Sequence, residues 1–205
     1  MIKNVVFDIG NVMVSFDPLQ ALYDELGDME KAKRLKPIIF SKFWGECDYG
    51  HITLEEQMDL TVQMSPNDEK FIRHFLSTRI NMFHLITYTR DVIYDLKKSG
   101  VDMYYLSDTS FDVIAGLKEK HEFFEFFKGG VISCAEKSRK CDDDLKIFKV
   151  FLDRYDLDPS ECVFIDDSKV NIEHAKLAGI NTIHLKDPSV IRQELLKFEG
   201  LEDKL

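Results

Sequence analysis

The chain begins with a short, unbroken apolar run that ends in a carboxylate. Residues 5–7 are Val-Val-Phe, and Asp8, Ile9 and Gly10 follow them. A run that is continuous, β-branched and aromatic, rather than alternating, is typical of a strand buried on both faces of a parallel sheet. The carboxyl ends of such strands open into the ligand crevice, so Asp8 is a candidate metal ligand or nucleophile. The alternative is an aspartate that only starts a turn.

Residues 16–82 show helical spacing and no strong strand pattern. In the stretch 43–51, Trp44 and His51 are candidates to face a ligand, although an aromatic such as Trp44 is more often part of a helical core. The apolar stripes of the block are interpreted as internal packing. Start signals predict four helices in this block. The first begins at Asp17-Pro18 and ends at Gly27, and the second begins at Pro37. The third begins with a capping box from Thr53 to Glu56, and the fourth is capped by Asn67.

From residue 88 onward, predicted strands alternate with predicted helices. Strands are expected over 101–106, 130–134, 161–165 and 181–185, and helices over 89–98, 108–119, 142–155 and 169–178. Alternating units of this length predict a parallel sheet with right-handed crossovers. The expected fold class is therefore α/β: a doubly wound, Rossmann-like parallel-sheet core over 1–15 and 83–205, with an α-helical cap inserted at 16–82.

Composition narrows the class of protein. The 205 residues are 44% apolar and 31% charged, which is typical of a soluble globular protein. No apolar stretch approaches the roughly 20 residues of a membrane span, and residues 1–4 run straight into the first strand without a secretory signal. The four cysteines lack metal-site spacing, and Cys134 and Cys162 fall in expected strands as buried thiols, so a reducing, cytoplasmic location is expected. A net charge of −10 argues against a nucleic-acid partner, but an anionic substrate remains compatible because a bound cation reverses the local field.

Polar side chains follow three of the expected strands. Asp8 follows the first strand, Ser107 the second, and Asp166 and Asp167 the fourth. Because parallel strands end at one edge of the sheet, these groups should meet there. Gathered carboxylates are costly unless a cation joins them, and carboxylate oxygens are ligands that Mg²⁺ prefers. We therefore expect a Mg²⁺ site at this edge.

Lys140 is the candidate cation for an anion carried by that metal. It follows the third expected strand and precedes the helix predicted over 142–155, whose N-terminal end also favours anions. The alternative is an ordinary exposed lysine.

The motifs, in this order, resemble those of the haloacid dehalogenase (HAD) superfamily of phosphohydrolases, in the branch (subfamily I type) with a helical cap after the first strand. The resemblance covers nearly the whole chain. It rests on Phe-Asp-Ile-Gly-Asn-Val at 7–12, Leu-Ser-Asp at 106–108, Lys140, and Phe-Ile-Asp-Asp-Ser at 164–168 with Asn171, Ala175 and Ala178-Gly179.

This resemblance implies a role for each matching residue. Asp8 would attack phosphorus and form an aspartyl-phosphate, and Mg²⁺ would be held by Asp8, the Gly10 carbonyl and Asp167, with Asp166 supporting the site. The resemblance also implies residues that bind the substrate and its phosphate: Ser107 and Lys140 as catalytic phosphate-binding groups, and Ile9, Gly10, Asn11 and Asp108 around them. Trp44 and His51 are substrate-binding candidates only because the cap stretch 43–51 could face the site.

The chain departs from the family pattern at two places. Many relatives carry a second aspartate as general acid and base where this chain has Gly10, and a glycine-bearing branch resembles sugar-1-phosphate phosphatases. Such an acid is worth roughly 10²–10⁴ in rate, so either the leaving group is activated or the cap supplies the acid, with His51, Asp48 and Glu46 as candidates.

The second departure is in the lysine motif. Cys141 replaces the usual proline after Lys140, and three aspartates at 142–144 add about two residues. These acids could weaken anion binding, but we favour their placement in the first turn of a helix, where acids stabilise the dipole. Lys137 is the second candidate for the lysine role.

The expected activity is Mg²⁺-dependent hydrolysis of a small phosphorylated metabolite, with a sugar phosphate as one candidate. The main alternative is a catalytically weak relative that binds a phospho-ligand or regulates a partner. A metal-free dehalogenase is disfavoured by the paired acids Asp166 and Asp167, and a phosphomutase by the missing second acid.

Overall fold

The structure is a computed structural model that describes all residues, 1–205. A five-stranded sheet forms its centre, in the order β5-β4-β1-β6-β7, and every neighbouring pair of strands is parallel. The chain adds β4 and β5 on one side of β1 and then returns to add β6 and β7 on the other. The order therefore reverses beside β1, where α/β sheets bind their ligands. The strands span β1 Asn4–Phe7, β4 Asp102–Ser107, β5 Gly129–Ile132, β6 Cys162–Asp166 and β7 Asn181–His184.

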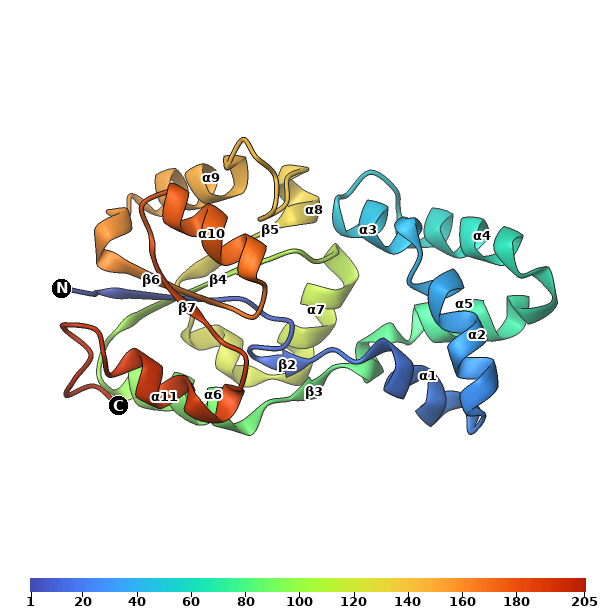
Figure 1. The fold of residues 1–205 in the computed structure, drawn as a ribbon, viewed down its shortest axis with the longest axis horizontal. Helices are drawn as coiled ribbons and strands as arrows, with labels where there is room; N and C mark the ends of the chain where they lie inside the picture. Colours follow the sequence, from blue (N-terminus) through green and yellow to red (C-terminus); the bar gives the residue numbers. More distant parts are fainter.

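Helices cover both faces of this sheet (Figure 1). On one face, α6 Thr87–Lys98, α7 Phe111–Lys120 and α11 Ile191–Leu195 pack over Val5 and Phe7; on the other, α9 Lys146–Tyr155 and α10 Lys169–Leu177 pack over Val6. Successive residues of β1 are thus buried on opposite faces, which explains why the run is apolar throughout. The predicted doubly wound α/β fold is confirmed.

The helices between residues 18 and 77 form a second lobe with its own apolar core (Figure 1). A two-stranded antiparallel ribbon, β2 Val14–Ser15 with β3 His84–Leu85, joins the two lobes. The predicted boundaries of the cap lie next to this ribbon, and the division into core 1–15 and 83–205 and cap 16–82 remains our proposal. The cap helices are α1 Pro18–Leu26, α2 Met29–Ile39, α3 Lys42–Asp48, α4 Leu54–Met64 and α5 Glu69–Ser77.

Short helical turns complete the fold. None of the helices combines the length and apolarity needed to cross a membrane. All four cysteines are free. The short elements are η1 Pro66–Asp68, η2 Arg79–Met82, η3 Glu122–Phe126, α8 Ser133–Glu136, η4 Pro159–Glu161 and η5 Pro188–Val190.

Several helix boundaries follow the predicted signals. The side chain of Asp17 accepts hydrogen bonds from the first turn of α1, and Gly27 ends that helix with a left-handed φ of 64°. Thr53 and Glu56 form both bonds of a capping box at α4.

Two predicted cap boundaries are wrong. Pro37 does not open a helix but lies near the end of α2, because Asp28 already starts that helix by accepting a hydrogen bond from the Lys31 amide. Asn67 does not cap a helix either: it lies inside the turn η1, and α5 begins at Glu69.

Two boundaries in the core also differ from prediction. Strand β5 ends at Ile132, so Cys134 lies in α8, although its thiol is buried as expected. The helix predicted over 142–155 begins only at Lys146, because Leu145 adopts a left-handed backbone with φ 57°. The three aspartates at 142–144 therefore precede the helix instead of filling its first turn.

Candidate active site

The carboxyl ends of β1 and β6 bring the predicted acids together. The two strands pair in register, with Phe7 opposite Ile165, so Asp8 and Asp166 follow at the same level. One carboxylate oxygen from each of Asp8, Asp166 and Asp167 lies within 4.8 Å of the others. The structure thus forms the acidic cluster that strand topology predicts.

Lys140 lies inside this cluster. Its Nζ is 2.8 Å from Asp8 Oδ1 and 2.6 Å from Asp166 Oδ2, and the residue is 1% exposed. Burial opposes its charge, but the surrounding carboxylates outweigh that effect and raise the pKa of Lys140, so it stays protonated. Lys140 is therefore not an ordinary surface lysine. The second candidate, Lys137, is exposed.

The neighbouring helix does not assist Lys140 as expected. Because α9 begins only at Lys146, its N-terminal end lies further along the chain than the sequence suggests. The lysine is held instead through its backbone, whose amide donates to Asp108 Oδ1 at 3.1 Å. Burial raises the pKa of Asp108, while Lys140 opposes that shift.

Asp166 has its oxygens occupied by protein groups. It is fully buried, and it accepts hydrogen bonds from the Ser168 amide at 2.7 Å, from Asn171 Nδ2 at 3.0 and 3.2 Å, and from Lys140. A carboxylate so fully bonded orients its neighbours rather than offering an oxygen to a ligand. This position matches the supporting role that the resemblance implies.

Asp8 and Asp167, by contrast, each keep an oxygen that no protein group bonds. Asp8 Oδ1 accepts from the Ile9 amide at 2.7 Å and faces Lys140, whereas Asp167 Oδ2 accepts from Asn11 Nδ2 at 3.0 Å. Burial raises the pKa of Asp8 and Lys140 opposes that shift. Carboxylate oxygens without donors, in a cluster whose ligand atoms lie within 4.8 Å of one another, are suited to a hard divalent cation, so the donor set fits Mg²⁺.

The loop after β1 is held by its own groups. The Ile9 amide, expected to contact phosphate, donates to Asp8 in this structure. Asn11 has a left-handed φ of 53°, and besides donating to Asp167 it accepts a hydrogen bond from the Phe16 amide at 2.9 Å. Asn11 thus links the acidic cluster to the start of the cap, and it does not line the adjacent pocket.

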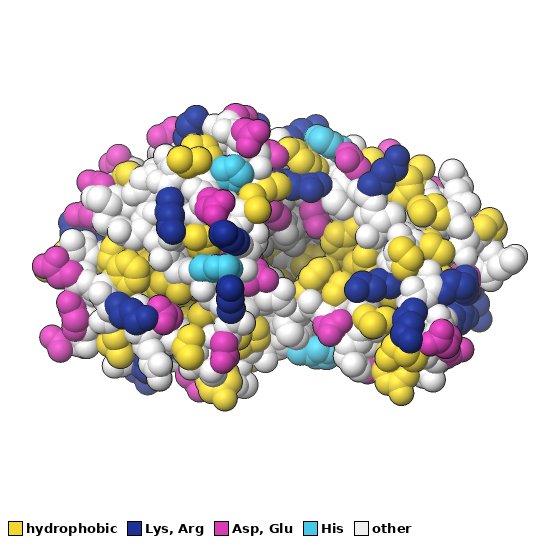
Figure 2. Space-filling model, viewed as in Figure 1, with side chains coloured by type: hydrophobic (Ala, Val, Ile, Leu, Met, Phe, Trp, Pro, Cys, Tyr) yellow, Lys and Arg dark blue, Asp and Glu magenta, His cyan; other side chains and the backbone are white.

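That pocket lies between the sheet edge and the cap. Ser107, the buried last residue of β4, lines it with Gly10 and Asp108, as expected of substrate-binding groups. Figure 2 shows a hollow between the two lobes with hydrophobic side chains along it. The pocket encloses about 440 Å³, counting space open to solvent, and is lined by Ile9, Gly10, Phe16, Trp44, Asp48, Phe83, Ser107, Asp108, Thr109 and Val113.

The two cap residues singled out from the sequence have different positions. Trp44 lines the pocket and also packs in the cap core, 4.7 Å from Phe40 between ring centroids. His51 does not line it: its Nδ1 lies 2.8 Å from Glu46 Oε2, and it borders a separate cavity. The expectation for His51 is corrected, because the chain turns at Gly50, with φ 74°, before reaching it.

Several pocket residues were missed by sequence reasoning. Phe16 and Phe83 are at the two ends of the cap segment, and their rings stack at 5.6 Å. Thr109 and Val113 follow β4. An aromatic residue at each junction of an insertion could have been noticed, but no pattern in the sequence distinguishes a pocket wall from core.

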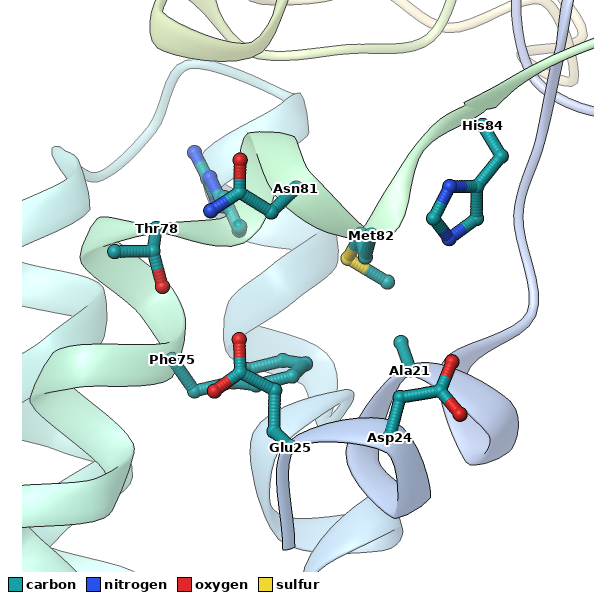
Figure 3. Close-up of a pocket in the computed structure, with 9 residues that line it drawn as sticks. Ala21, Asp24, Glu25, Phe75, Thr78, Asn81, Met82 and His84 are labelled. Atoms are coloured by element: carbon teal, nitrogen blue, oxygen red, sulfur yellow. The ribbon is translucent and has the colours of Figure 1, made fainter.

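Another cavity is lined by residues of the cap and by His84 of β3, and no residue of the acidic cluster lines it. Figure 3 shows Asp24, Glu25 and His84 around it, together with Phe75 and Asn81. None of the residues predicted for the site lines this cavity.

Comparison with known proteins identifies the family. The family model described as haloacid dehalogenase-like hydrolase matches residues 2–179. The chain belongs to this family. This chain has a parallel-sheet core and carries a lobe of helices beside it.

Individual relatives agree with this assignment. The chain is 25% identical over 199 residues to the sesquiterpene phosphatase of Aspergillus oryzae, covering 97% of each chain. A HAD family enzyme of Bacteroides thetaiotaomicron, solved with magnesium and inorganic phosphate, has a TM-score of 0.70 at 23% identity, covering 89% of this chain and 93% of that one. The L-2-haloacid dehalogenase of Xanthobacter autotrophicus has a TM-score of 0.66 at 15% identity, covering 97% and 84%.

Proposed function

We propose that this hydrolase is a Mg²⁺-dependent phosphatase that cleaves a small phosphomonoester through an aspartyl-phosphate on Asp8. One observation carries the proposal: buried Lys140 bridges Asp8 and Asp166, while Asp8 and Asp167, in the same acidic cluster, each keep an oxygen that no protein group bonds. The phosphatase named among the relatives and the structural neighbour solved with magnesium and phosphate support the same chemistry.

The residues divide the chemistry among them. Asp8 attacks phosphorus through its carboxylate, and the alcohol leaves. Lys140 and Ser107 bind phosphate oxygens and stabilise the charge that develops there. Water then attacks the phosphorus of the aspartyl-phosphate, releasing phosphate and restoring Asp8. The cap excludes bulk water from the pocket during these steps.

Asp8 and Asp167 would hold Mg²⁺, with the Gly10 carbonyl as the third protein ligand that the family resemblance implies. When bound, the cation neutralises charge on the phosphate and on the attacking carboxylate. Asp166 orients Lys140, and Asn11 orients Asp167.

The alternatives predict different responses to the metal. A dehalogenase would use Asp8 without a cation, although the two unbonded carboxylate oxygens favour one. A catalytically weak relative would bind a phosphorylated ligand and turn over nothing.

The decisive experiment measures phosphate release from an aryl phosphate and a panel of phosphorylated metabolites, with Mg²⁺ and with a chelator. Release should require Mg²⁺ and should vanish in Asp8→Asn, whereas Glu30→Gln, on the exposed surface of the cap, should match the natural protein. Binding without release across the panel would favour the weak relative, and release of halide from a haloacid without metal would favour the dehalogenase.

For the leaving group, we propose an alcohol with an apolar body in preference to a sugar. Phe16, Trp44 and Phe83 line the pocket. Of its polar residues, Ser107, Asp108 and Thr109 lie at the sheet edge, where the phosphate would bind, and Asp48 comes from the cap, so few groups remain for sugar hydroxyls. The name of the Aspergillus oryzae relative is consistent with an apolar alcohol.

This preference is tested by comparing kcat/KM for glucose 1-phosphate with that for a prenyl or medium-chain alkyl phosphate. The apolar substrate should be preferred, and Trp44→Ala should reduce that preference. A higher kcat/KM for the sugar phosphate would return the assignment to the sugar-phosphatase branch.

A further inference from the structure

Asp48 is the acidic side chain that the cap contributes to the pocket. It ends helix α3 and lines the pocket with Gly10 and Ser107. The other two candidates, Glu46 and His51, pair with each other at 2.8 Å, have side chains 44% and 46% exposed, and do not line the pocket. The structure therefore separates one of the three candidates from the rest.

The end of helix α3, which carries Asp48, contacts the core. Ser133 Oγ donates to the Asp48 carbonyl at 2.5 Å. Two residues on, the backbone of Gly50 approaches that of Cys134 so closely that a Cβ would lie 2.3 Å from the Cys134 carbonyl oxygen. These contacts hold the end of α3 against the core.

The end of α3 is also held on its outer side. The guanidinium of Arg139 donates to the Gly45 carbonyl at 2.5 Å and lies 4.5 Å from the centroid of the Tyr49 ring. The hydroxyl of Tyr49 donates to Asp142, one of the three inserted acids. Asp142 thus helps to dock the cap on the core, which gives this acid a structural role.

The carboxyl group of Asp48 has no hydrogen-bond donor within the protein. The cations near it, Arg79 and Arg139, donate to other groups. Burial raises the pKa of Asp48 to about 7; the charges of Arg79 and Arg139 oppose the shift, and those of Asp108 and Asp112 add to it. A substantial fraction of Asp48 is therefore protonated at neutral pH.

On the basis of the proposed phosphatase function, we infer that Asp48 is the catalytic residue that protonates the leaving-group oxygen, in the pocket where Gly10 offers no side chain. As Asp8 forms its bond to phosphorus, the bond from phosphorus to the alcohol oxygen breaks. Its electron pair remains on that oxygen, which takes the proton of Asp48 and leaves as the neutral alcohol.

The resulting Asp48 carboxylate serves the second step. It takes a proton from water as the water oxygen bonds to phosphorus, and the bond between phosphorus and Asp8 breaks. Phosphate leaves, Asp8 is a carboxylate again, and Asp48 is again protonated. One residue thus acts as acid and then as base.

The test compares two substrates in Asp48→Asn with Mg²⁺ present. With an alkyl phosphate, kcat/KM should fall by about 10²–10⁴-fold, because the alkoxide needs a proton as it leaves. With p-nitrophenyl phosphate the loss should be less than about tenfold, because p-nitrophenolate is a weak base and leaves without one. This second activity also shows that the variant is folded.

The pH dependence gives a second readout. For the alkyl phosphate, kcat/KM of the natural protein should decline as the pH rises through about 7, where Asp48 loses its proton, and Asp48→Asn should lack that decline. The control Glu46→Gln, at the exposed residue paired with His51, should retain both the rate and the pH profile.

Equal losses on the two substrates would overturn the inference and leave Asp48 as a binding or positioning residue. An undiminished alkyl rate in Asp48→Asn would overturn it as well. Failure of the phosphatase proposal is distinguishable, because the natural protein would then release no phosphate from either substrate.

Discussion

Arg79 offers a quantitative test of how the cap is joined to the core. It lies in η2 at the end of the cap segment, is 3% exposed, and faces the ring of Trp44 at 5.1 Å. Its guanidinium donates twice to Asp112 on α7, at 2.6 and 2.7 Å, once to Ser110 Oγ at 2.8 Å, and once to Gln57 Oε1 on α4 at 2.9 Å. One buried cation thus connects two cap helices with a core helix.

We predict that Arg79→Met lowers the free energy of unfolding by about 3–4 kcal/mol. Removing one partner of a buried ion pair costs about 3–5 kcal/mol when the other partner stays buried. The Asp112 side chain is 39% exposed and can regain water, so the loss of its pair with Arg79 should cost about 2 kcal/mol. Gln57 is fully buried and would lose the partner of its carbonyl oxygen, which costs about 1–2 kcal/mol more.

Arg73→Met is the matched control. Arg73 also bonds two carboxylates, Glu69 at 2.9 Å and Asp59 at 2.8 Å, but its side chain is 40% exposed. Exposed pairs are worth at most about 1 kcal/mol because water and salt screen them. The two variants therefore remove the same kind of contact in different surroundings.

The assay is urea unfolding at pH 7, followed by circular dichroism, for the natural protein and both variants. Arg79→Met should lower the midpoint severalfold more than Arg73→Met. Equal losses in the two variants, or a loss below about 1 kcal/mol in Arg79→Met, would refute the assignment of Arg79 as a buried link between cap and core.

Three further outcomes are expected. Gly50→Ala should lose both stability and phosphatase activity, because φ is 74° and the new Cβ would lie 2.3 Å from the Cys134 carbonyl oxygen. The control Gly27→Ala, at φ 64° with nothing within 4 Å, should lose only about 1–2 kcal/mol of unfolding free energy and keep its activity. Equal effects of the two substitutions on activity would contradict this prediction. The hydrogen bond from Arg34 lowers the pKa of Asp68 from 3.8 to about 2. The contribution of this ion pair to stability is therefore present above about pH 4 and lost as the pH falls through about 2. The difference in unfolding free energy between the natural protein and Asp68→Asn should shrink over that range, and a constant difference would speak against the pair. Mg²⁺ at a hundredfold excess over its Kd should stabilise the protein by about 2.7 kcal/mol relative to a chelator, and an unchanged melting temperature would count against the metal site.

Much of the acidic cluster could be predicted from the sequence. Asp8 and Asp166 directly follow apolar runs, and parallel strands must end at a common edge, so strand order alone brings these residues together. The helix starts at Asp17 and Thr53 were also predictable, because a cap depends on residues three or four positions apart. Lys140 could be named as a candidate, but its burial between two carboxylates could not be inferred from its own neighbours in the chain.

The sequence by itself determined the elements that local periodicity and capping specify, and with them the sheet and the acids at its edge. Only the tertiary structure decided which cap residues meet that edge. Asp48 and His51 are three positions apart, yet only Asp48 lines the pocket, because the intervening turn is set by contacts with Ser133, Cys134 and residues further along the core. The hydrogen bonds among these contacts join residues 85 to 94 positions apart, and no pattern along one segment records the shape of the surface on which it packs.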